Sequence, residues 1–212
     1  MAAALTDLIH QRTLNINLLL YPDVEILDFA GPYEVFSVAS RIALRDALLP
    51  HAPFKVHTVA AEPGLVPARH GLRVQADASL LTAQACDVLI VPGGIVDRPL
   101  AHRPTLDWVA ATAERTALVT SVCTGAFILA RAGVLSDQTV TTHWDDIEPL
   151  RRDYPALTVV GDVPYVDLGE LITSAGISAG IDMSLHMVAR LLGGEAARRT
   201  ARQMQYEWQD RD

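Results

Sequence analysis

Cysteine, long apolar runs and linker-like segments are all scarce in this sequence. Only two cysteines occur, Cys86 and Cys123, so a disulfide framework is excluded and a reducing compartment is predicted. No window contains the roughly 18 uninterrupted apolar residues that a membrane-spanning helix needs. The stretch from Met1 to Asn15 also lacks the basic start and the apolar run of a secretory signal. We therefore expect a cytoplasmic protein that does not bind membranes.

Nothing in the sequence marks a boundary between domains. There is no stretch rich in Gly, Ser and Pro together, no internal repeat and no low-complexity segment. A chain of 212 residues with 50% hydrophobic composition can bury one sizeable core. We expect an N-terminal extension over 1–14 and a single domain over 15–212 that ends in an extra C-terminal helix. The formal net charge of -8 argues against nucleic acid as a partner.

What the sequence does contain is an alternation of two patterns. Short runs rich in Val, Ile and Leu alternate with longer segments of helical period, which predicts a mostly parallel sheet with helices on both faces. The stronger strands are expected at Asn15–Tyr21, Phe54–Ala60, Asp87–Val91, Ala117–Val122 and Leu171–Ser174, of which the first, third and fourth look buried on both faces. Weaker strands are expected at Leu72–Asp77, Thr139–Thr142, Thr158–Val160 and Pro164–Leu168. Helices are expected at Pro32–Arg45, Thr105–Arg115, Gly125–Ala132, Asp145–Asp153, Ser178–Leu192 and Glu195–Gln209. Because ligands of open parallel sheets bind at the carboxyl ends of the strands, candidate site residues are those that follow the strong strands.

Cys123 follows one of these buried strands directly, at the point where a helix begins. Small residues stand two positions to either side, Ser121 and Gly125, which is the spacing of a nucleophile elbow, a cramped strand-to-helix turn. A helix N-terminus favours a thiolate, because unpaired N–H groups and the positive end of the helix dipole face the sulfur. The terminus supplies at most about 2 kcal/mol, so further hydrogen bonds are expected from the amides of Thr124 and of a glycine loop. A buried cysteine without function is the common alternative, and Cys86, which lacks such surroundings, fits it.

Two more strand ends carry residues that suit a site. Pro92-Gly93-Gly94 ends the third strong strand, and its glycines either form an anion-binding turn or simply allow a tight turn. Asp28, in the apolar stretch after the first strand, either caps the following helix or faces Cys123. If it faces Cys123, the pKa of the Asp28 carboxyl would be raised, and the carboxyl would serve as a proton donor.

His143 and a short serine motif complete the set of candidates. His143 follows a weaker strand and is either a base for the thiol or a structural histidine, and no histidine pair has the spacing of metal ligands. Segment 176–180 reads GISAG and matches the serine-hydrolase pattern. Asp182 and His186, however, lie on the same expected helix as its serine, whereas such an enzyme needs them on separate loops. We interpret the two glycines as the start of a helix packed closely on the sheet.

The order of three segments gives the chain a family resemblance. Pro92-Gly93-Gly94, Ser121-Val122-Cys123-Thr124-Gly125 and Thr141-Thr142-His143-Trp144 resemble the ThiJ/PfpI superfamily of class I glutamine amidotransferase-like proteins. The likeness runs from about Asn15 to about Gly194, and includes Leu27-Asp28-Phe29-Ala30-Gly31-Pro32 and the glycine-rich stretch from Ser174 to Asp182. Within the superfamily the chain looks most similar to isonitrile hydratases.

The resemblance implies both a fold and a site. The fold it implies is a flavodoxin-like three-layer sandwich with a nucleophile elbow, and such proteins are usually homodimers. The resemblance also implies a small-molecule substrate, with neither a cofactor nor a metal. The catalytic residues it implies are Cys123, Asp28 and Thr124, and the substrate-binding residues are Gly93, Gly94, Ile95 and His143. Peptidase-like members carry a histidine at the position of Thr124, so this chain departs from their pattern and proteolysis is not expected.

Alternatives to isonitrile hydration stay open on the sequence. Glyoxalase-like and deglycase-like members usually carry a glutamate at the position of Asp28, which argues against that chemistry without excluding it. A non-catalytic domain could bind a small metabolite, or use Cys123 as a redox switch. Transcription regulators of the superfamily share the SVCTG and TTHW segments and continue into a helix-turn-helix domain. Only one further helix is expected here after Gly194, and the acidic balance does not suit DNA.

Overall fold

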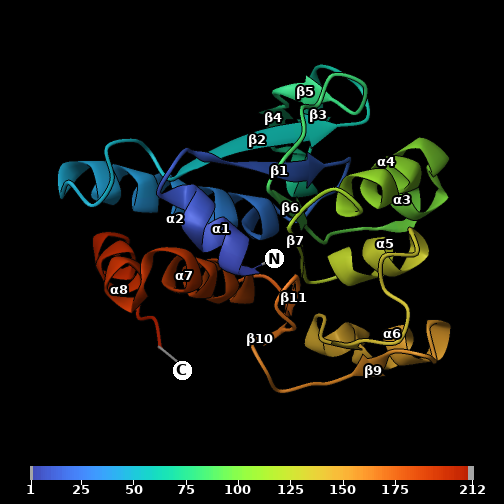
Figure 1. Cartoon of the computed structure of the whole chain (residues 1–212). Helices are drawn as coiled ribbons and strands as arrows, with labels where there is room; N and C mark the ends of the chain where they lie inside the picture. Colours follow the sequence, from blue (N-terminus) through green and yellow to red (C-terminus); the bar gives the residue numbers. More distant parts are fainter. Residues whose placement is uncertain (1, 210–212) are drawn as a thin grey trace.

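A seven-stranded sheet forms the centre of the molecule (Figure 1). The computed structural model describes residues 2–209, with the side chains of residues 5–209. The strand order is β10-β11-β7-β6-β1-β2-β5, and all neighbours are parallel except β10 and β11. The strands are β1 (Leu14–Leu20), β2 (Phe54–Ala60), β5 (Ala78–Ser79), β6 (Val88–Val91), β7 (Leu118–Val122), β10 (Tyr165–Asp167) and β11 (Leu171–Ser174). The mostly parallel sheet predicted from the sequence is confirmed.

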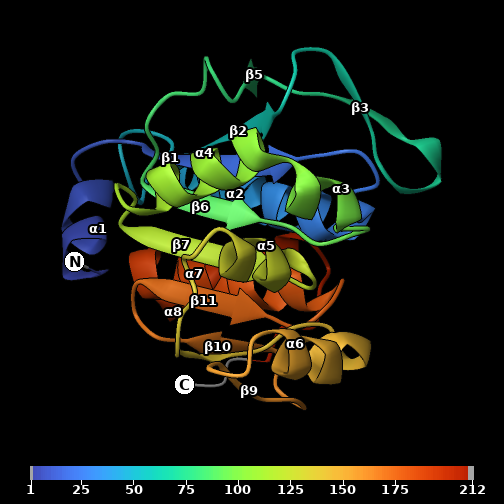
Figure 2. The same ribbon diagram turned by 90° about the vertical axis from the view of Figure 1, so that its right-hand side faces the viewer.

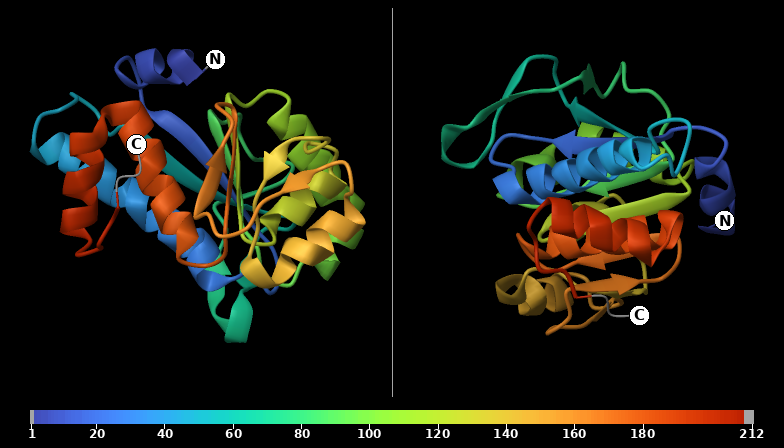
Figure 3. Two further views of the ribbon diagram at one scale, coloured as in Figure 1. Left: turned by 90° about the horizontal axis from the view of Figure 1, so that it is seen from below. Right: turned by 90° about the vertical axis from the view of Figure 1, so that its left-hand side faces the viewer.

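Helices cover both faces of the sheet and complete three layers (Figure 3). One face carries α2 (Ile26–Arg45), α7 (Ala179–Leu192) and α8 (Gly194–Gln203), with α1 (Ala2–Ile9) against α7. The other face carries α3 (Asp97–Ala101), α4 (Arg103–Ala113), α5 (Gly125–Arg131) and α6 (Ile147–Asp153). Over residues 2–209, no helix has both the length and the apolar character that crossing a bilayer would require. The arrangement is the expected flavodoxin-like sandwich.

The three central strands are buried on both faces, as their apolar sequences predict. Every residue of β6 and β7 is buried, and so is every residue of β1 except Asn15. Figure 2 shows these strands side by side, and their parallel pairing makes them all end at the same edge of the sheet. The loops that follow β1, β6 and β7 therefore meet there, which is where a site is expected.

Helix α2 begins at Ile26 instead of at Pro32, where the sequence predicts its start. A proline is favoured in the first helical turn, so Gly31-Pro32 reads as a helix beginning. In the structure this pair instead lies where two helices approach closely: a Cβ at Gly31 would be 2.9 Å from Cγ1 of Ile181 in α7. Packing therefore overrides the local signal, and Asp28 lies in the first turn of the helix rather than in a loop.

Other differences from the expected elements lie at the periphery. The sequence does not predict α1, α3, β5 or β3 (Leu65–Pro67), which pairs antiparallel with β4 (Arg73–Gln75). Helix α8 ends at Gln203, whereas the sequence predicts a helix up to Gln209. The left-handed backbone of Gln205, with φ 51°, cannot continue a helix of L-residues. These elements are short or marginal, and their sequences carry little periodic signal.

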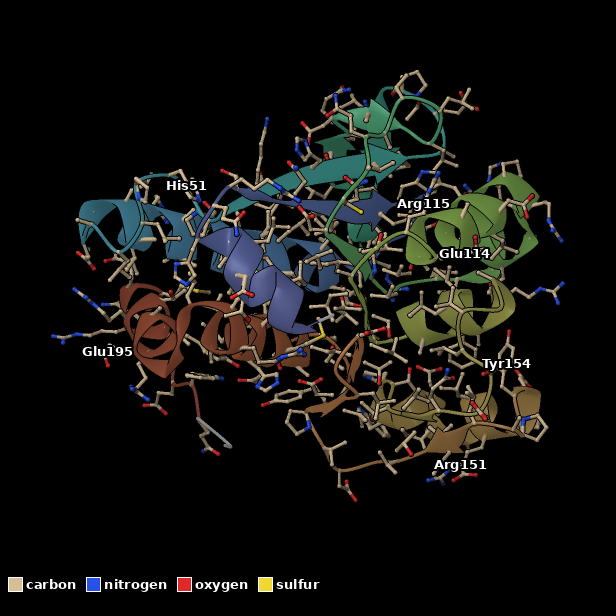
Figure 4. All side chains as sticks on the ribbon, viewed as in Figure 1. His51, Glu114, Arg115, Arg151, Tyr154 and Glu195 are labelled. Carbon is tan, nitrogen blue, oxygen red and sulfur yellow. The ribbon has the colours of Figure 1, made fainter. Side chains whose placement is uncertain are left out.

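A second small sheet lies outside the main one, near α6. It pairs β8 (Thr139–Val140) with β9 (Thr158–Val159) in parallel, and a 3-10 turn (Trp144–Asp146) leads from β8 into α6. Arg151, labelled on α6 in Figure 4, donates from Nε at 3.0 Å and from Nη2 at 2.6 Å to the carbonyl oxygen of Val159. The segment after α5 thus forms a small sheet and a helix that are bonded to each other and lie beside the main sheet.

Asp167 joins the β10–β11 hairpin to helix α7. Its Oδ2 lies 2.7 Å from Nε2 of His186, and its two oxygens accept from Nη1 of Arg190 at 2.9 and 3.0 Å. The ring of Tyr165 stacks on His186 with centroids 4.6 Å apart. Burial opposes ionisation of Asp167, but the hydrogen bond from His186 and the charge of Arg190 hold its pKa below the usual range. This network links the antiparallel edge of the sheet, where β10 pairs with β11, to helix α7.

We expect Asp167→Asn to lower the free energy of unfolding by about 1–3 kcal/mol at pH 7, because it weakens the partner of the half-buried guanidinium of Arg190. The pKa of Asp167 is depressed in the folded state, so its contribution is present above the unfolded value of about 3.9 and disappears as pH falls through the folded value. Urea unfolding at pH 7 and pH 3 measures this. Asp107→Asn, which breaks the exposed pair with Arg103, is the control and should change stability much less than Asp167→Asn does. Equal effects of the two variants at pH 7 would contradict the prediction.

Candidate active site

Cys123 occupies a strained turn between β7 and α5, as the elbow pattern predicts. Its φ is 56°, in the left-handed region that non-glycine residues seldom adopt. The turn is held from both sides: the Cys123 N–H lies 3.2 Å from the carbonyl oxygen of Ser174, and its carbonyl accepts from Oγ1 of Thr142 at 2.8 Å. A Cβ at Gly125 would collide with the carbonyl oxygen of Val91. The nucleophile elbow is therefore confirmed as a backbone geometry.

Asp28 lies beside this thiol, in the first turn of α2. Its side chain is 0% exposed, and Oδ2 accepts from the Gly93 N–H at 3.1 Å, while Oδ1 is buried without a well-aligned hydrogen bond. The helix-capping alternative does not hold, because the N-cap residue of α2 is Glu25 and no side chain caps the helix. Burial is the main cause that raises the pKa of Asp28 to about 7, against the Gly93 hydrogen bond that lowers it. At neutral pH the carboxyl is thus poised between its two protonation states.

The backbone N–H groups of the glycines after β6 bond to protein oxygens inside the site and do not form an open anion-binding turn. The Gly93 N–H binds Asp28, and the Gly94 N–H donates to Oγ1 of Thr124 at 2.9 Å, which in turn donates to the Gly94 carbonyl at 3.0 Å. The Ile95 N–H likewise donates to the carbonyl oxygen of Asp23 at 3.1 Å. The sequence predicts that amides of this glycine loop bond to the sulfur of Cys123, and those of Gly93 and Gly94 instead donate to protein oxygens. The hydroxyl of Thr124, a residue that the family resemblance implies is catalytic, is bonded to the backbone of Gly94.

Close approach explains why Gly93 has no side chain. A Cβ there would lie 2.6 Å from the backbone nitrogen of Thr124 and 2.8 Å from Oδ2 of Asp28, and real Cβ atoms do not approach other atoms so closely. Because glycine has no Cβ, the loop after β6 can contact both the elbow and the start of α2. The glycine therefore positions the thiol and the carboxyl relative to each other.

The electrostatics of Cys123 differ from the expected thiolate. Burial, followed by the charge of Asp28, raises the pKa of the thiol to about 12, and only the backbone N–H of Thr124 acts in the opposite direction. A helix terminus stabilises a charge by at most about 2 kcal/mol, which does not offset the cost of removing a thiolate from water beside a carboxylate. At neutral pH the pair therefore consists of a protonated thiol and a carboxyl whose pKa is raised to about 7.

His143 lies near the elbow but does not bond to the thiol. Its Nδ1 accepts from the Asp145 N–H at 3.4 Å and lies 3.5 Å from Oδ2 of Asp146. The other edge of the ring packs so closely on Gly176 that a Cβ there would collide with it. Its observed role is thus to cap the turn at 144–146 and to pack against the loop after β11. That placement gives no support to a Cys–His pair.

Three site residues escape sequence reasoning. Thr142 supplies the hydrogen bond to the Cys123 carbonyl, Tyr21 donates from its hydroxyl to the Pro92 carbonyl at 2.9 Å, and the Ile177 N–H acts on Asp28. Ile177 also has φ 55°, which is rare for a β-branched residue. Thr142 lies in the TTHW segment and Ile177 in the GISAG segment, but neither motif reveals the role of its residue, because each of the three residues acts through the backbone or on it.

The remaining candidates are structural. Cys86 is buried, with its sulfur 3.6 Å from Oγ1 of Thr116. In the segment 176–180, a Cβ at Gly180 would be 2.9 Å from Val122, so this glycine allows α7 to pack closely on the sheet, as expected. His186 is engaged with Asp167 on the hairpin, away from the motif's serine. Among residues 2–209, no group of three or more His, Cys, Asp or Glu side chains is arranged to hold a metal ion.

Comparison with known proteins places this geometry among relatives. A sequence model of the DJ-1/PfpI family matches residues 15–190. Isonitrile hydratase from Pseudomonas putida is 34% identical over 198 residues, which are 91% of this chain and 78% of that enzyme. An HTH-type transcriptional regulator from Pseudomonas aeruginosa, CdhR, is 29% identical over 180 residues, covering 84% of this chain but only 51% of the regulator.

Solved structures agree with the fold. A ThiJ/PfpI family protein from Pseudomonas syringae superposes with a TM-score of 0.79 at 29% identity, covering 95% of this chain and 78% of its own. DJ-1beta from Drosophila melanogaster superposes with a TM-score of 0.78 at 21% identity, covering 93% of this chain and 100% of its own. The second likeness bears on the fold alone.

We expect Thr142→Val to destabilise the elbow, because it removes the hydroxyl that binds the Cys123 carbonyl. The loss should be about 1–3 kcal/mol, the usual result of removing one partner of a buried hydrogen bond. Thr142→Ser keeps the hydroxyl and should lose much less. Denaturant unfolding of the two variants measures the difference, and equal losses would show that the hydroxyl is not what holds the turn.

Asp28 should make stability depend on pH. Its pKa rises from 3.8 to about 7 on folding, so between these values the folded state binds more protons and stability falls as pH rises. Asp28→Asn cannot ionise, so its stability should be flatter over this range and exceed the wild-type value at pH 8 by up to about 4 kcal/mol. Asp153→Asn, at an exposed position, should follow the wild-type curve. Parallel curves for wild type and Asp28→Asn in urea unfolding would contradict a shifted carboxyl.

Proposed function

The chain belongs to the DJ-1/PfpI family, and we propose that within this family it hydrates an isonitrile to an N-substituted formamide. The observation that carries the proposal is the pairing of Cys123 with a buried carboxyl whose pKa is about 7. An isonitrile needs a nucleophile and a proton at the same terminal carbon. A thiol next to a carboxyl that both accepts and returns a proton offers these two groups at one place.

The first step adds the thiol across the terminal carbon. As the sulfur of Cys123 forms the S–C bond, its proton passes to the Asp28 carboxylate, and Asp28 then delivers a proton to the same carbon. The product is a thioimidate, R–N=CH–S–Cys123, so the atoms of thiol and isonitrile are all conserved. Because the thiol is protonated at rest, Asp28 acts first as a base and then as an acid, a dual role that a pKa near neutrality suits.

The second step uses water and releases the enzyme. Water adds to the thioimidate carbon, the nitrogen takes up a proton, and the resulting R–NH–CH(OH)–S–Cys123 collapses. The C–S bond breaks, the hydroxyl proton leaves as the formyl C=O forms, and the sulfur recovers a proton. Asp28 deprotonates the attacking water and returns the proton to sulfur. The products are R–NH–CHO and the free thiol, and no cofactor takes part.

A binding or sensing role is the second candidate, favoured by the likeness to the regulator CdhR. Two forms of it can be separated on physical grounds. A redox switch needs a thiolate that reacts with an oxidant, and the raised pKa of Cys123 works against it. A domain that only binds a metabolite has no such requirement, and it differs from the hydratase in giving no turnover.

We expect wild-type protein to convert cyclohexyl isonitrile into N-cyclohexylformamide, followed by chromatography. Cys123→Ala should fall to the background rate, because no nucleophile remains. Asp28→Asn should lose about 10²–10⁴-fold in kcat, the usual contribution of a general acid–base group. Cys86→Ala, which removes only the buried structural cysteine, should keep turnover. Formamide production by Cys123→Ala, or none by the wild type while the isonitrile still binds, would overturn the hydratase proposal.

A further inference from the structure

Tyr21 is a buried phenol that lies directly after β1, beside the loop that follows β6. The residue is 5% exposed, and its hydroxyl donates to the carbonyl oxygen of Pro92 at 2.9 Å. Strands β1 and β6 are parallel neighbours, with Leu18 opposite Ile90, so the residues that follow the two strands lie side by side. A hydroxyl is costly to bury unless it is hydrogen-bonded, and this one bonds to the backbone of the loop that binds Asp28.

The oxygen that Tyr21 binds belongs to the same peptide group as the amide that binds Asp28. The carbonyl of Pro92 and the N–H of Gly93 are the two ends of one planar unit. The oxygen accepts from the Tyr21 hydroxyl at 2.9 Å, and the N–H donates to Oδ2 of Asp28 at 3.1 Å. A continuous chain of bonds therefore runs from the phenol, through one peptide group, to the carboxyl.

Local restraints on the orientation of this peptide group are weak. A proline fixes its own φ but not its ψ, and Gly93, which has no Cβ, permits a wide range of φ. Rotation about these two bonds turns the carbonyl and the N–H together, because the unit is planar. The next peptide group is held at its oxygen by the Glu25 N–H, which donates to the Gly93 carbonyl at 2.9 Å. The Tyr21 hydroxyl holds the oxygen of the Pro92–Gly93 group in the corresponding way.

The phenol stays protonated and therefore remains a donor. Burial raises the pKa of Tyr21 well above its usual value, and the charges of Asp28, Cys123 and Glu25 act in the same direction. Glu25 has a basic neighbour, Arg69, at 3.6 Å. The hydroxyl thus keeps its proton over the range in which Asp28 titrates, and it acts on the carboxyl as a hydrogen-bond donor rather than as a charge.

Asp28 is subject to opposing influences from every segment that faces it. Burial raises its pKa, and so does the charge of Glu25, which precedes α2. Three donors lower the pKa: the N–H of Gly93, which has the largest effect of the three, the thiol of Cys123 and the N–H of Ile177. The most effective donor therefore belongs to the peptide group that the phenol holds.

We propose that Tyr21 is a positioning residue of the active site, whose hydroxyl holds the Pro92–Gly93 peptide group so that its N–H is directed at Asp28 and polarised toward it. Hydrogen bonds in a chain strengthen one another where water is excluded, so the bond at the oxygen strengthens the bond made by the N–H. This keeps Asp28 able to ionise despite its burial. The consequence for turnover rests on the proposed function, in which the Asp28 carboxylate accepts the thiol proton of Cys123.

NMR of isotopically labelled aspartate carboxyls tests this inference without any turnover. Asp28→Asn identifies the resonance of Asp28, whose midpoint in wild type should lie near its pKa of about 7. Tyr21→Phe removes only the hydroxyl and should raise this midpoint by at least about 0.3 pH unit, the result of weakening a hydrogen bond to a charged group by about a quarter. The amide proton of Gly93 should move upfield at the same time. An unchanged midpoint would refute the proposal.

Thr120→Val is the matched control. The hydroxyl of Thr120 is buried and donates at 3.1 Å to the carbonyl oxygen of Leu89, on the strand that leads to Pro92. Each variant deprives a buried carbonyl of one hydrogen bond, so both should lose stability to a similar extent in urea unfolding. Only Tyr21→Phe should shift the titration of Asp28. An equal shift in both variants would assign the effect to a general loosening of the sheet and would overturn the proposal.

A fluorinated tyrosine tests the same bond without removing it. One fluorine beside the hydroxyl, on a tyrosine introduced in place of Tyr21, makes the phenol more acidic and therefore a stronger donor, while the ring and the bond to Pro92 remain. The midpoint of Asp28 should then fall below the wild-type value, opposite in sign to the effect of Tyr21→Phe. A midpoint that stays constant or rises would contradict the proposal, whatever the stability of Tyr21→Phe.

Steady-state kinetics connect these variants to turnover. In wild type, kcat/KM for cyclohexyl isonitrile should rise with pH through the pKa of Asp28, because only the carboxylate accepts the thiol proton. Tyr21→Phe should move this rise to higher pH, so that kcat/KM at about pH 6 falls at least about 2-fold while the value at about pH 9 changes less. A shifted midpoint of Asp28 without turnover would keep the role of Tyr21 and reject the hydratase. Turnover with an unshifted rise would keep the hydratase and reject the role of Tyr21.

Discussion

The site depends on one constraint, the contact between the loop after β6 and the turn after β7. Gly93 and Gly125 allow it, because a side-chain atom on either would overlap the neighbouring backbone. Their approach brings the first turn of α2 within hydrogen-bond distance of the Gly93 amide. A thiol and a carboxyl that are 95 residues apart in sequence thus share one buried place, and their unusual protonation follows from that burial.

The sequence predicts most of the frame and the identity of the central residue. The apolar runs at β1, β6 and β7 read directly as buried strands, and the small residues around Cys123 indicate the elbow. Both signals are local, so no tertiary knowledge is needed to find them. The start of α2 is the instructive failure: Gly31-Pro32 looks like a helix beginning, and only its contact with α7 shows why a glycine and a proline occur inside a helix.

The chemistry of the site is less accessible from sequence, because it depends on burial and on backbone partners. A helix N-terminus suggests a thiolate, yet burial and the nearby carboxyl of Asp28 raise the pKa of Cys123 instead of lowering it. The amides of Gly93 and Gly94 look available in the sequence, and each already has an acceptor in the fold. Thr142 stands in the TTHW segment, but its role cannot be read there for a related reason, since it binds a backbone carbonyl that any residue would possess.

The crowding around Gly93 and Gly125 also bears on how this fold diverges. A side chain at either position would force several segments to move together, so a single substitution there is not tolerated unless other residues change at the same time. The exposed residues Leu27, Ile95, Trp144 and Ile177 meet no such restriction, because their side chains already extend into solvent. Selection can therefore alter these surface positions one residue at a time, while the backbone contacts that bring Cys123 and Asp28 together permit no intermediate form.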